Sequence, residues 1–563
     1  MSLLLILAWV VPLFLTVFAR RPGFGWLPAI AALPALAAAL LVPDSASLRL
    51  DWLLLGSHFA LDQTTRLFLL FTAILWVAAG IYASASRHHT HHEGRFNTFF
   101  LLAMTGNIWL ITGQDLVSFY VGFALMGIAS YGLVIHEGDR GALRAGQIYL
   151  TLTLAAEVIL FLALVTIAST TGTLEPTPED LNALDGATIT LLVLGLAVKA
   201  GLLPVHVWLP LAHPAAPIAA SAVLSGAMIK VALLGWLRFL PIGEIAQPDL
   251  GLFFVMMGLA TALYAIPIAL VQSNPKVLLA YSSVSKMGLM VLVLGLILIT
   301  PALAPSATLA LVLYAAHHAL AKGGLFLGIG LRKHAGTRGW VFAGLLVLAF
   351  SMAAVPLTGG AVAKFGIKPA IDALQWPWLK AMIALTVIGT AWLMARFLWL
   401  LWRIEPQSDV AQTAAARRIE WALLGWWPLV FLIALYPWAL GSPAAWLTDV
   451  GLILIALIIG LPVVWAARHR RALFAPLIDG IRPGDLLGPI RVILAALHFT
   501  LRHRLRRAQE ARILINRRAR VIWEQVLERP GDDWEQRLSA WPMAGTLWLA
   551  LIVAIITLSL LIV

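Results

Sequence analysis

The chain has 563 residues, of which 61% are hydrophobic and 12% are charged, with a formal net charge of +12. This composition excludes a soluble globular protein and is typical of an all-α polytopic membrane protein, because the apolar runs are long and continuous. The chain has no cysteine, which excludes disulfides, cysteine-ligated iron–sulfur clusters and thiol chemistry within it.

Apolar runs of about 20 residues, the length that crosses a bilayer, predict about 14 to 16 transmembrane helices. They fall near 2–19, 26–42, 67–85, 96–113, 115–135, 147–169, 187–205, 217–239, 250–272, 276–299, 304–331, 339–373, 379–402, 418–438, 445–466 and 544–563. The run at 339–373 is too long for one straight span and contains Pro356 and Gly359, so we interpret it as a broken helix with two halves.

Lysine and arginine gather in one set of loops, which the positive-inside rule assigns to the cytoplasm. These basic loops lie around 20–21, 87–95, 140–144, 276, 332–338 and 403–418, whereas the opposite loops are acidic at 44–62, 175–185 and 244–249. We therefore expect a multi-pass protein of the inner (plasma) membrane with its N-terminus outside.

The stretch Leu196–Lys230 is the most informative part of the chain. It places Lys199 and Lys230 deep in apolar helix, with a break at Pro204, then His206, and a second proline-rich break at 210–217. A charge at membrane depth costs on the order of 3 kcal/mol on insertion scales and is rarely present without a use. An ionisable residue beside an interrupted helix predicts an ion path near the middle of the membrane.

Further ionisable residues extend this pattern towards the C-terminus. A lysine in a low-dielectric site releases its proton more readily than one in water, so a row of such groups bridged by water forms a relay. The candidates are Lys199, Lys230, His318, Lys322 and Lys364, and the four-residue spacing puts His318 and Lys322 on one helix face. His206 is either a relay member or a structural histidine, whereas Lys286 and Lys380 fit snorkelling to an interface.

Five segments carry a resemblance to a known family. They are DLVSFYVGFALMGIASYGL (115–133), KAGLLPVHVWLPLAHPAAPIAASAVLSGAMIK (199–230), VLLAYSSVSKMGLM (277–290), HHALAKGGLFLGIG (317–330) and AAVPLTGGAVAKFGIKPA (353–370). Together they resemble the antiporter-like family, which includes D-type subunits of Mrp sodium/proton antiporters and the proton-pumping membrane subunits of complex I and of membrane-bound hydrogenases.

The resemblance implies two inverted five-helix repeats at 96–240 and 250–402, each with one broken helix. Around them we expect N-terminal spans at 1–95, C-terminal spans at 418–466, an arginine-rich amphipathic segment on the cytoplasmic surface at 467–543, and an anchor span at 544–563. The surface segment fits contact with anionic lipids and docking of partner subunits equally well.

The resemblance further implies a proton- or sodium/proton-translocating subunit of a multi-subunit membrane complex, with other membrane subunits as partners. The alternatives within transport are a proton-channel subunit of a hydrogenase, of a complex I relative or of an inorganic-carbon uptake system. An alternative of another class is a non-conducting scaffold. We expect no cofactor, no redox chemistry in this chain and no nucleic-acid partner.

One position departs from the family pattern. The family's fifth span carries a glutamate that pairs with the seventh-span lysine, and here Ala124 occupies the matching position. Glu157 lies in the next span, and both residues lie roughly 15 Å from the turn that joins their helices. We infer that Glu157 replaces the missing counter-charge of Lys199, with a locally bonded glutamate as the alternative.

The segment 87–96, RHHTHHEGRF, contains ligand-type side chains in a predicted cytoplasmic loop. His88, His89, His91 and His92 are weak candidates for a metal site, because their spacing matches no defined site. A solvated loop is the favoured interpretation.

Overall fold

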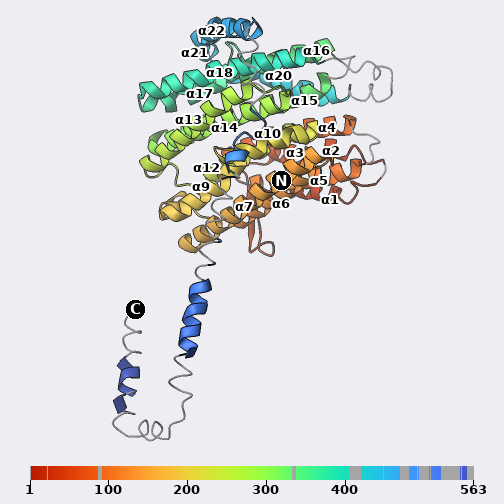
Figure 1. The fold of residues 1–563 in the computed structure, drawn as a ribbon. Coiled ribbons are helices and arrows are strands. Elements are labelled where there is room, and N and C mark those ends of the chain that lie inside the picture. The colour runs from red at the N-terminus through yellow and green to blue at the C-terminus, as the bar shows by residue number, and fades with distance from the viewer. Residues whose placement is uncertain are drawn as a thin grey trace. The chain divides into compact units, whose positions relative to one another are not determined.

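The computed structural model describes residues 2–21, 23–86, 92–332, 338–404, 420–447, 449–469, 481–490 and 509–521, and parts of 492–506 and 545–553. The chain divides into two compact units, residues 1–485 and 486–563. The first unit is a helical bundle (Figure 1), and in the second, residues 509–521 form a helix. Most of the predicted anchor span and most of the predicted surface segment lie outside the described residues.

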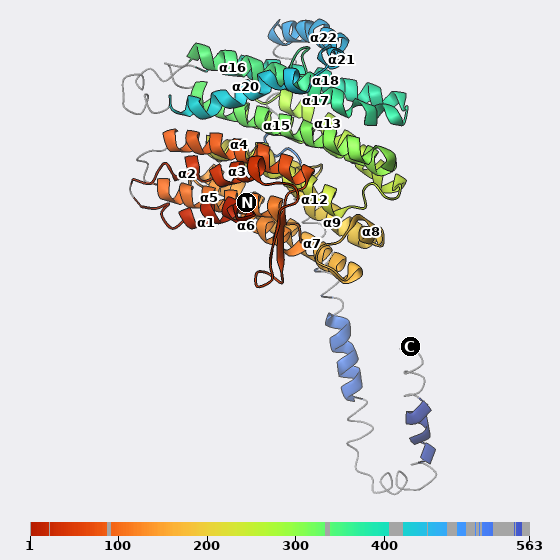
Figure 2. The same cartoon turned by 180° about the vertical axis from the view of Figure 1, so that it is seen from behind.

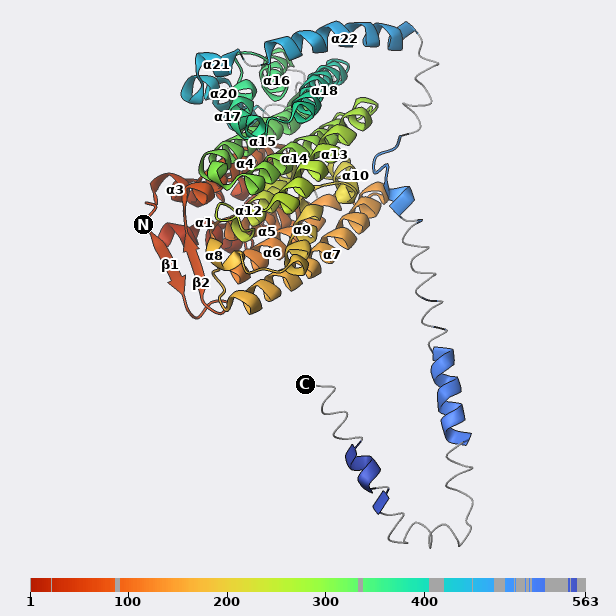
Figure 3. The same ribbon diagram turned by 90° about the vertical axis from the view of Figure 1, so that its left-hand side faces the viewer.

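The N-terminal region contributes short helices, one long helix and a β-hairpin. Its elements are α1 (Leu3–Leu15), α2 (Leu27–Ile30), α3 (Leu33–Leu41), β1 (Ser47–Leu50), β2 (Ser57–Ala60) and α4 (Gln63–Ser86). The strands pair antiparallel, with Ser47 opposite Ala60, and Figure 3 shows the hairpin at the edge of the bundle. Sequence patterning missed these strands, because each is only four residues long and lies between much longer apolar runs.

The region predicted as the first repeat contains two interrupted helices. Its elements are α5 (Glu93–Thr112), α6 (Leu116–Val134), α7 (Arg140–Thr171), α8 (Pro178–Leu181), α9 (Gly186–Ala200), η1 (Val205–Val207), α10 (Trp208–Ala215), α11 (Ile218–Gly226), η2 (Met228–Lys230) and α12 (Val231–Phe239). Helix α9 ends at Gly201, whose φ of 70° is left-handed, and Pro204 follows. The predicted span at 187–205 therefore continues through the break to Ala215, and Pro210 lies inside α10 instead of interrupting it.

The region predicted as the second repeat begins with two long helices and contains the second proline-associated break. The elements from here onwards are α13 (Pro248–Leu270), α14 (Pro275–Ile299), η3 (Pro301–Leu303), α15 (Ala304–Arg332), α16 (Arg338–Met352), α17 (Gly359–Ala373), α18 (Pro377–Trp402), α20 (Ala422–Leu440), α21 (Pro443–Trp446) and α22 (Val450–His469). The expected break within 339–373 is present between α16 and α17, where Ala354 and Leu357 have positive φ.

Glycines bring α13 and α14 into close contact along their length. A Cβ atom on Gly258 or Gly288 would overlap the backbone of the opposite helix, and Gly251 and Gly295 make the same approach farther along. The close packing holds the two helices in a fixed register and thereby fixes the relative positions of Tyr264 on α13 and Tyr281 on α14.

The described residues contain ten helices that are long and apolar enough to cross a membrane, and four shorter apolar helices. This agrees with the predicted all-α polytopic architecture. Helix α10 packs against α14 and α11 packs against α15, so the two predicted repeats lie side by side (Figure 2). That the two regions are inverted copies of each other stays a prediction.

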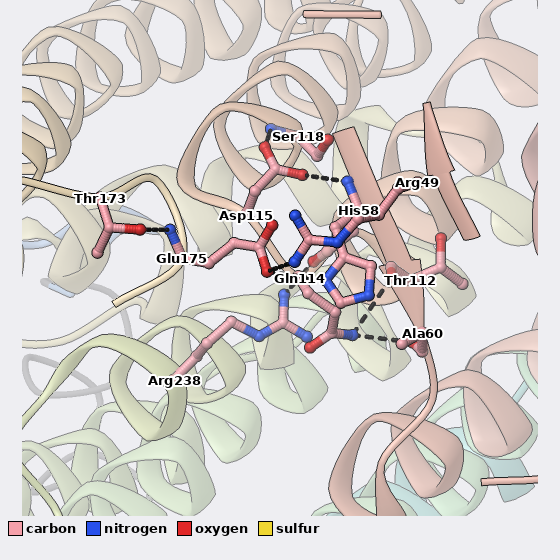
Figure 4. A network of polar contacts seen from close by, with 11 residues as sticks. Arg49, His58, Ala60, Thr112, Gln114, Asp115, Ser118, Thr173, Glu175 and Arg238 are labelled. Carbon is pink, nitrogen blue, oxygen red and sulfur yellow. Dashed lines mark hydrogen bonds and ion pairs between the residues drawn. The ribbon is translucent and has the colours of Figure 1, made fainter. Parts of the chain in front are cut away.

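A polar network ties the hairpin to the acidic-loop end of the bundle (Figure 4). Asp115 caps α6 through the Ser118 amide at 2.7 Å and also accepts a hydrogen bond from the His58 amide at 3.0 Å. Glu175 binds Arg49 at 2.7 Å and the His58 ring at 2.9 Å. Arg238, at the end of α12, donates to the last carbonyl groups of α5. The network therefore joins the hairpin to α5, α6 and α12 through hydrogen bonds and the Glu175 ion pairs.

Candidate functional site

Lys199 lies in the last turn of α9, directly before the break, and its side chain is buried. Its Nζ donates a hydrogen bond to the Tyr149 hydroxyl at 3.2 Å and lies 5.8 Å from the Phe123 ring centroid. The Trp208 indole donates to the Val198 carbonyl at 2.7 Å, which connects α10 back to α9 across the break. The lysine therefore faces protein on all sides and does not reach an interface.

Glu157 is buried on the inner side of α7 and is 4% exposed, although its neighbours Leu154 and Val158 are exposed. Its carboxylate lies against α6 at Gly127, so closely that a Cβ atom on that glycine would overlap Oε1. The Gly127 carbonyl accepts a hydrogen bond from the Tyr149 hydroxyl at 3.0 Å, and the same hydroxyl accepts from Lys199. Glu157 thus contacts Gly127, and the Gly127 carbonyl binds the same Tyr149 hydroxyl that binds Lys199.

The carboxylate reaches α6 one helical turn after Ala124, the position that the sequence identified as altered. The charges of Glu157 and Lys199 interact electrostatically, but no ion pair joins them among the described residues. The geometry fits an indirect pair in which Tyr149 or water lies between the charges. That Glu157 replaces the missing glutamate stays a prediction.

Lys230 is fully buried at a second interruption, which the sequence did not reveal. The short 3-10 turn η2 separates α11 from α12, and the Lys230 ammonium donates a hydrogen bond to the Ser225 carbonyl that the interruption leaves open. No proline marks this break, so the sequence signal used for the other two breaks was missing. η2 packs against α9, which carries Lys199.

A pair of serine hydroxyls continues the polar path from the first region into the second. The hydroxyls of Ser225 on α11 and Ser283 on α14 lie 2.7 Å apart, and Ser283 donates to the Leu279 carbonyl at 3.0 Å. Lys322, on α15, donates to the same carbonyl at 2.9 Å. Buried hydrogen bonds therefore link the two predicted relay lysines Lys230 and Lys322 across the junction of the two regions.

Beyond Lys322, a cavity of about 10 Å³ has room for one water molecule. Lys286, His317, His318 and Lys364 are among the residues that line it, so the structure brings two predicted relay residues to one cavity. His318 is 1% exposed, and neither of its ring nitrogens makes a hydrogen bond to a described residue. His317, which sequence reasoning passed over, binds the Ser351 hydroxyl at 2.7 Å and so connects α15 to the second break.

The expected snorkelling of Lys286 is wrong, because this side chain is 8% exposed and faces the cavity. Lys380 behaves as expected, since it is half-exposed and pairs with Asp372 at 2.8 Å. Lys286 joins the candidate relay between Lys322 and Lys364, and it interacts electrostatically with both.

Lys364, in α17 just after the second break, forms an ion pair with Asp449. Both side chains are largely buried, at 13% and 15% exposure. Asp449 precedes α22 and has a φ of 61°, and no local pattern in the sequence indicated that it reaches α17.

His206 lies in η1, within the first break, and is fully buried. The nearest carboxylate in the described ion pairs belongs to Asp485, whose Oδ1 lies 3.5 Å from Nε2 of the histidine. Tyr264 and Tyr281 both donate hydrogen bonds to this carboxylate. Sequence reasoning missed Asp485, because it lies far from every motif segment.

The four histidines that were weak candidates for a metal site lie mostly outside the described residues. His88, His89 and His91 are not described, and His92 is exposed at the start of α5. The described part of the chain holds no group of three or more side chains arranged to bind a metal.

These features define an all-α polytopic membrane protein with discontinuous helices and an internal row of buried ionisable side chains. Residues 113–390 match the sequence profile of the transmembrane family of NADH:quinone oxidoreductase and Mrp antiporter subunits. This part of the chain, which holds Glu157 and every lysine of the row, is similar to the members of that family.

Curated relatives agree with the family assignment. The chain is 28% identical over 336 residues to hydrogenase-4 component B of Escherichia coli, a match covering 54% of this chain and 49% of that protein. It is 29% identical over 338 residues to the D-type subunit of the Na(+)/H(+) antiporter from Alkalihalophilus pseudofirmus, covering 55% and 66%. The matched region is thus about half the length of the first of these relatives.

The fold has a solved counterpart. A chain of the membrane-bound sulfane sulfur reductase, an archaeal respiratory membrane complex, superposes with a TM-score of 0.67 at 22% identity, covering 99% of this chain and 100% of that one. At this identity the likeness shows the fold alone.

Proposed function

We propose that this protein is a proton-translocating subunit of a multi-subunit membrane complex. The observation that carries the proposal is a row of buried hydrogen bonds between Lys230 and Lys322. Each lysine donates to a backbone carbonyl, and the paired hydroxyls of Ser225 and Ser283 lie between them. Burying this many polar groups in an apolar bundle is costly, and membrane proteins rarely retain such groups without a function. The path joins two regions that each contain a broken helix, which is where ion sites of membrane transporters form.

The order of groups along the path suggests how a proton moves. Glu157 and Lys199 form one end, Lys230 and Lys322 lie at the junction, and Lys286 with Lys364 and Asp449 forms the other end. Like charges in a low-dielectric interior repel one another strongly, so protonation of one lysine favours release from its neighbour. Carbonyl groups only accept hydrogen bonds, so water has to complete the path between the ionisable groups.

The setting of this activity follows from the loops and the relatives. We place the protein in the plasma membrane with the basic loops in the cytoplasm and the N-terminus outside. Other membrane subunits are the expected partners, since the relatives are themselves named as an antiporter subunit and a hydrogenase component. Sodium/proton exchange and a proton channel in a hydrogenase-type complex are the two forms of this function that the relatives favour.

The serine pair offers a test with a matched control. Ser282 and Ser283 are adjacent and both buried, but only Ser283 bridges to Ser225, whereas the Ser282 hydroxyl makes no hydrogen bond to a described residue. The complex, purified with its natural partners, is reconstituted into vesicles and proton flux is recorded with a pH-sensitive dye. We expect Ser283→Ala to slow the flux about tenfold or more and Ser282→Ala to leave it near the wild-type rate.

The result also decides between transport and the scaffold alternative. A wild-type complex without flux, or equal flux in both serine variants, contradicts the proposed path. If Lys230→Ala and Lys322→Ala then still conduct at the wild-type rate, the lysine row is a relic and the scaffold interpretation replaces transport.

A further inference from the structure

The five residues Ile481–Asp485 return into the helical bundle of the first unit. The Gln272 side chain donates to the Ile481 carbonyl at 3.4 Å, and the Gly484 amide donates to the Tyr281 hydroxyl at 3.3 Å. Gly484 has a φ of 74°, and a Cβ atom there would lie 2.9 Å from the Leu211 side chain. The segment therefore docks through its backbone and needs glycine at its closest approach.

The docked segment places the Asp485 carboxylate inside the helical bundle, at a depth where burying a charge costs free energy. Tyr264 and Tyr281, which hold Asp485, each lie seven residues from the turn that joins α13 to α14, and thus about 10 Å below it along the helices. The turn is on the side of the basic loops, because Lys276 follows it. A buried charge at such depth in a membrane protein marks a functional group.

His206 is the group that this carboxylate faces. The histidine lies in the first helix break and is fully buried, and neither ring nitrogen makes a hydrogen bond to a described residue. Asp485 Oδ1 is 3.5 Å from Nε2, which is longer than a hydrogen bond and short enough for contact after a small movement. The Asp485 side chain is 9% exposed and His206 is not exposed at all, so the carboxylate is the outer member of the pair.

We propose that Asp485 is the proton-accepting residue at the basic-loop end of the first region and passes protons to His206. The Asp485 carboxylate takes a proton from a hydronium ion, which is left as water, and the resulting O–H transfers it to Nε2 of an imidazole that carries its own proton on Nδ1. Asp485 is then a carboxylate again, and the imidazolium releases its other N–H proton inward, towards Lys199 on the same discontinuous span. This inference rests on the proposed function and adds a residue that lies outside the matched family region.

A purely structural role predicts a different outcome on mutation. As an anchor, Asp485 accepts one tyrosine hydroxyl on each carboxylate oxygen, and asparagine keeps one of these two acceptors, so docking has to be measured beside flux. As a proton acceptor, Asp485 needs a titratable carboxylate, which asparagine lacks and glutamate keeps. Asp485→Asn and Asp485→Glu therefore separate the two roles.

The test combines flux with a docking readout in the full complex in vesicles. Because the chain has no cysteine, the pair Gln272→Cys with Ile481→Cys reports docking through a short bifunctional thiol cross-linker, without background from this chain. We expect Asp485→Asn to cross-link as the wild type does while its proton flux falls at least tenfold, and Asp485→Glu to recover part of the flux. Gly484→Ala should lower both readouts, whereas Gly488→Ala, which has open space around it, should lower neither.

Two results overturn the inference. One is wild-type flux in Asp485→Asn with the cross-link intact, and the other is a parallel loss of flux and cross-linking, since anchoring alone then explains the residue. Lys199→Ala is measured beside these variants as the reference for the proposed function. If Lys199→Ala does not reduce flux, proton translocation through this row is contradicted. The Asp485 variants are still compared with the wild type, so their result is interpreted independently.

Discussion

The Glu157 carboxylate lies against the backbone of Gly127, and a side chain at that glycine would occupy the position of the carboxylate. This contact gives a way to displace the charge without removing it. We predict that Gly127→Ala reduces proton flux about as much as Glu157→Gln, because the added methyl group pushes the carboxylate away from the Tyr149–Lys199 contact. Gly186→Ala, where no atom lies within 4 Å, is the control and should leave flux unchanged.

Glu157 and Lys199 should behave as one functional unit. We predict that Glu157→Ala and Lys199→Ala each abolish transport while the complex still assembles, and that the double variant is no worse than either single one. Leaving one buried charge of a pair alone costs on the order of 3–5 kcal/mol, so stability is measured in parallel. The combination of Glu157→Ala with Ala124→Glu should restore part of the flux, and wild-type flux in Glu157→Ala contradicts the pairing.

The Lys364–Asp449 pair connects the second broken helix to the start of α22. We predict that Asp449→Asn destabilises the protein by about 1–3 kcal/mol, because it leaves the largely buried Lys364 without its counter-charge. Thermal unfolding in detergent measures this effect. Asp372→Asn removes the exposed partner of Lys380 and should shift the unfolding temperature much less. Equal shifts in the two variants exclude a special role for Asp449.

Lys286 and Lys380 test whether burial identifies relay lysines. Both are long cationic side chains in apolar helices, but Lys286 faces the cavity with His318 and Lys364, whereas Lys380 is half-exposed. We predict that Lys286→Gln lowers proton flux at least tenfold and that Lys380→Gln changes it less than twofold. Wild-type flux in Lys286→Gln places this residue outside the path.

The sequence was sufficient to predict the all-helical bundle and the breaks at Pro204 and Pro356, because proline and long apolar runs act locally. It also identified Lys199, Lys230 and Lys322 as buried, since each has apolar neighbours on both sides. It could not reveal the partners of these residues. Asp449 and Asp485 reach the row through tertiary contacts over long sequence distances. The interruption at η2 is not marked by a proline, so no local pattern indicated it.

The docked segment also changes how the C-terminal region is to be tested. The sequence suggested that deleting 468–563 costs partner association more than insertion of the other spans. Because this deletion also removes Asp485, we predict separate effects for two truncations. A chain ending at 491 should insert normally and lose partners on co-purification, whereas one ending at 467 should additionally lose flux in any complex that still forms. Full partner recovery with the shorter deletion contradicts docking through 492–563.

The position of Asp485 in the chain has a consequence for biosynthesis. The ribosome makes residues 481–485 after every helix that carries a relay residue, so the contact with His206 is among the last to form. An unfinished chain in the membrane therefore has its lysines inserted but no proton-accepting carboxylate beside the first break. With the proposed role of Asp485, we expect such an incomplete protein not to conduct protons.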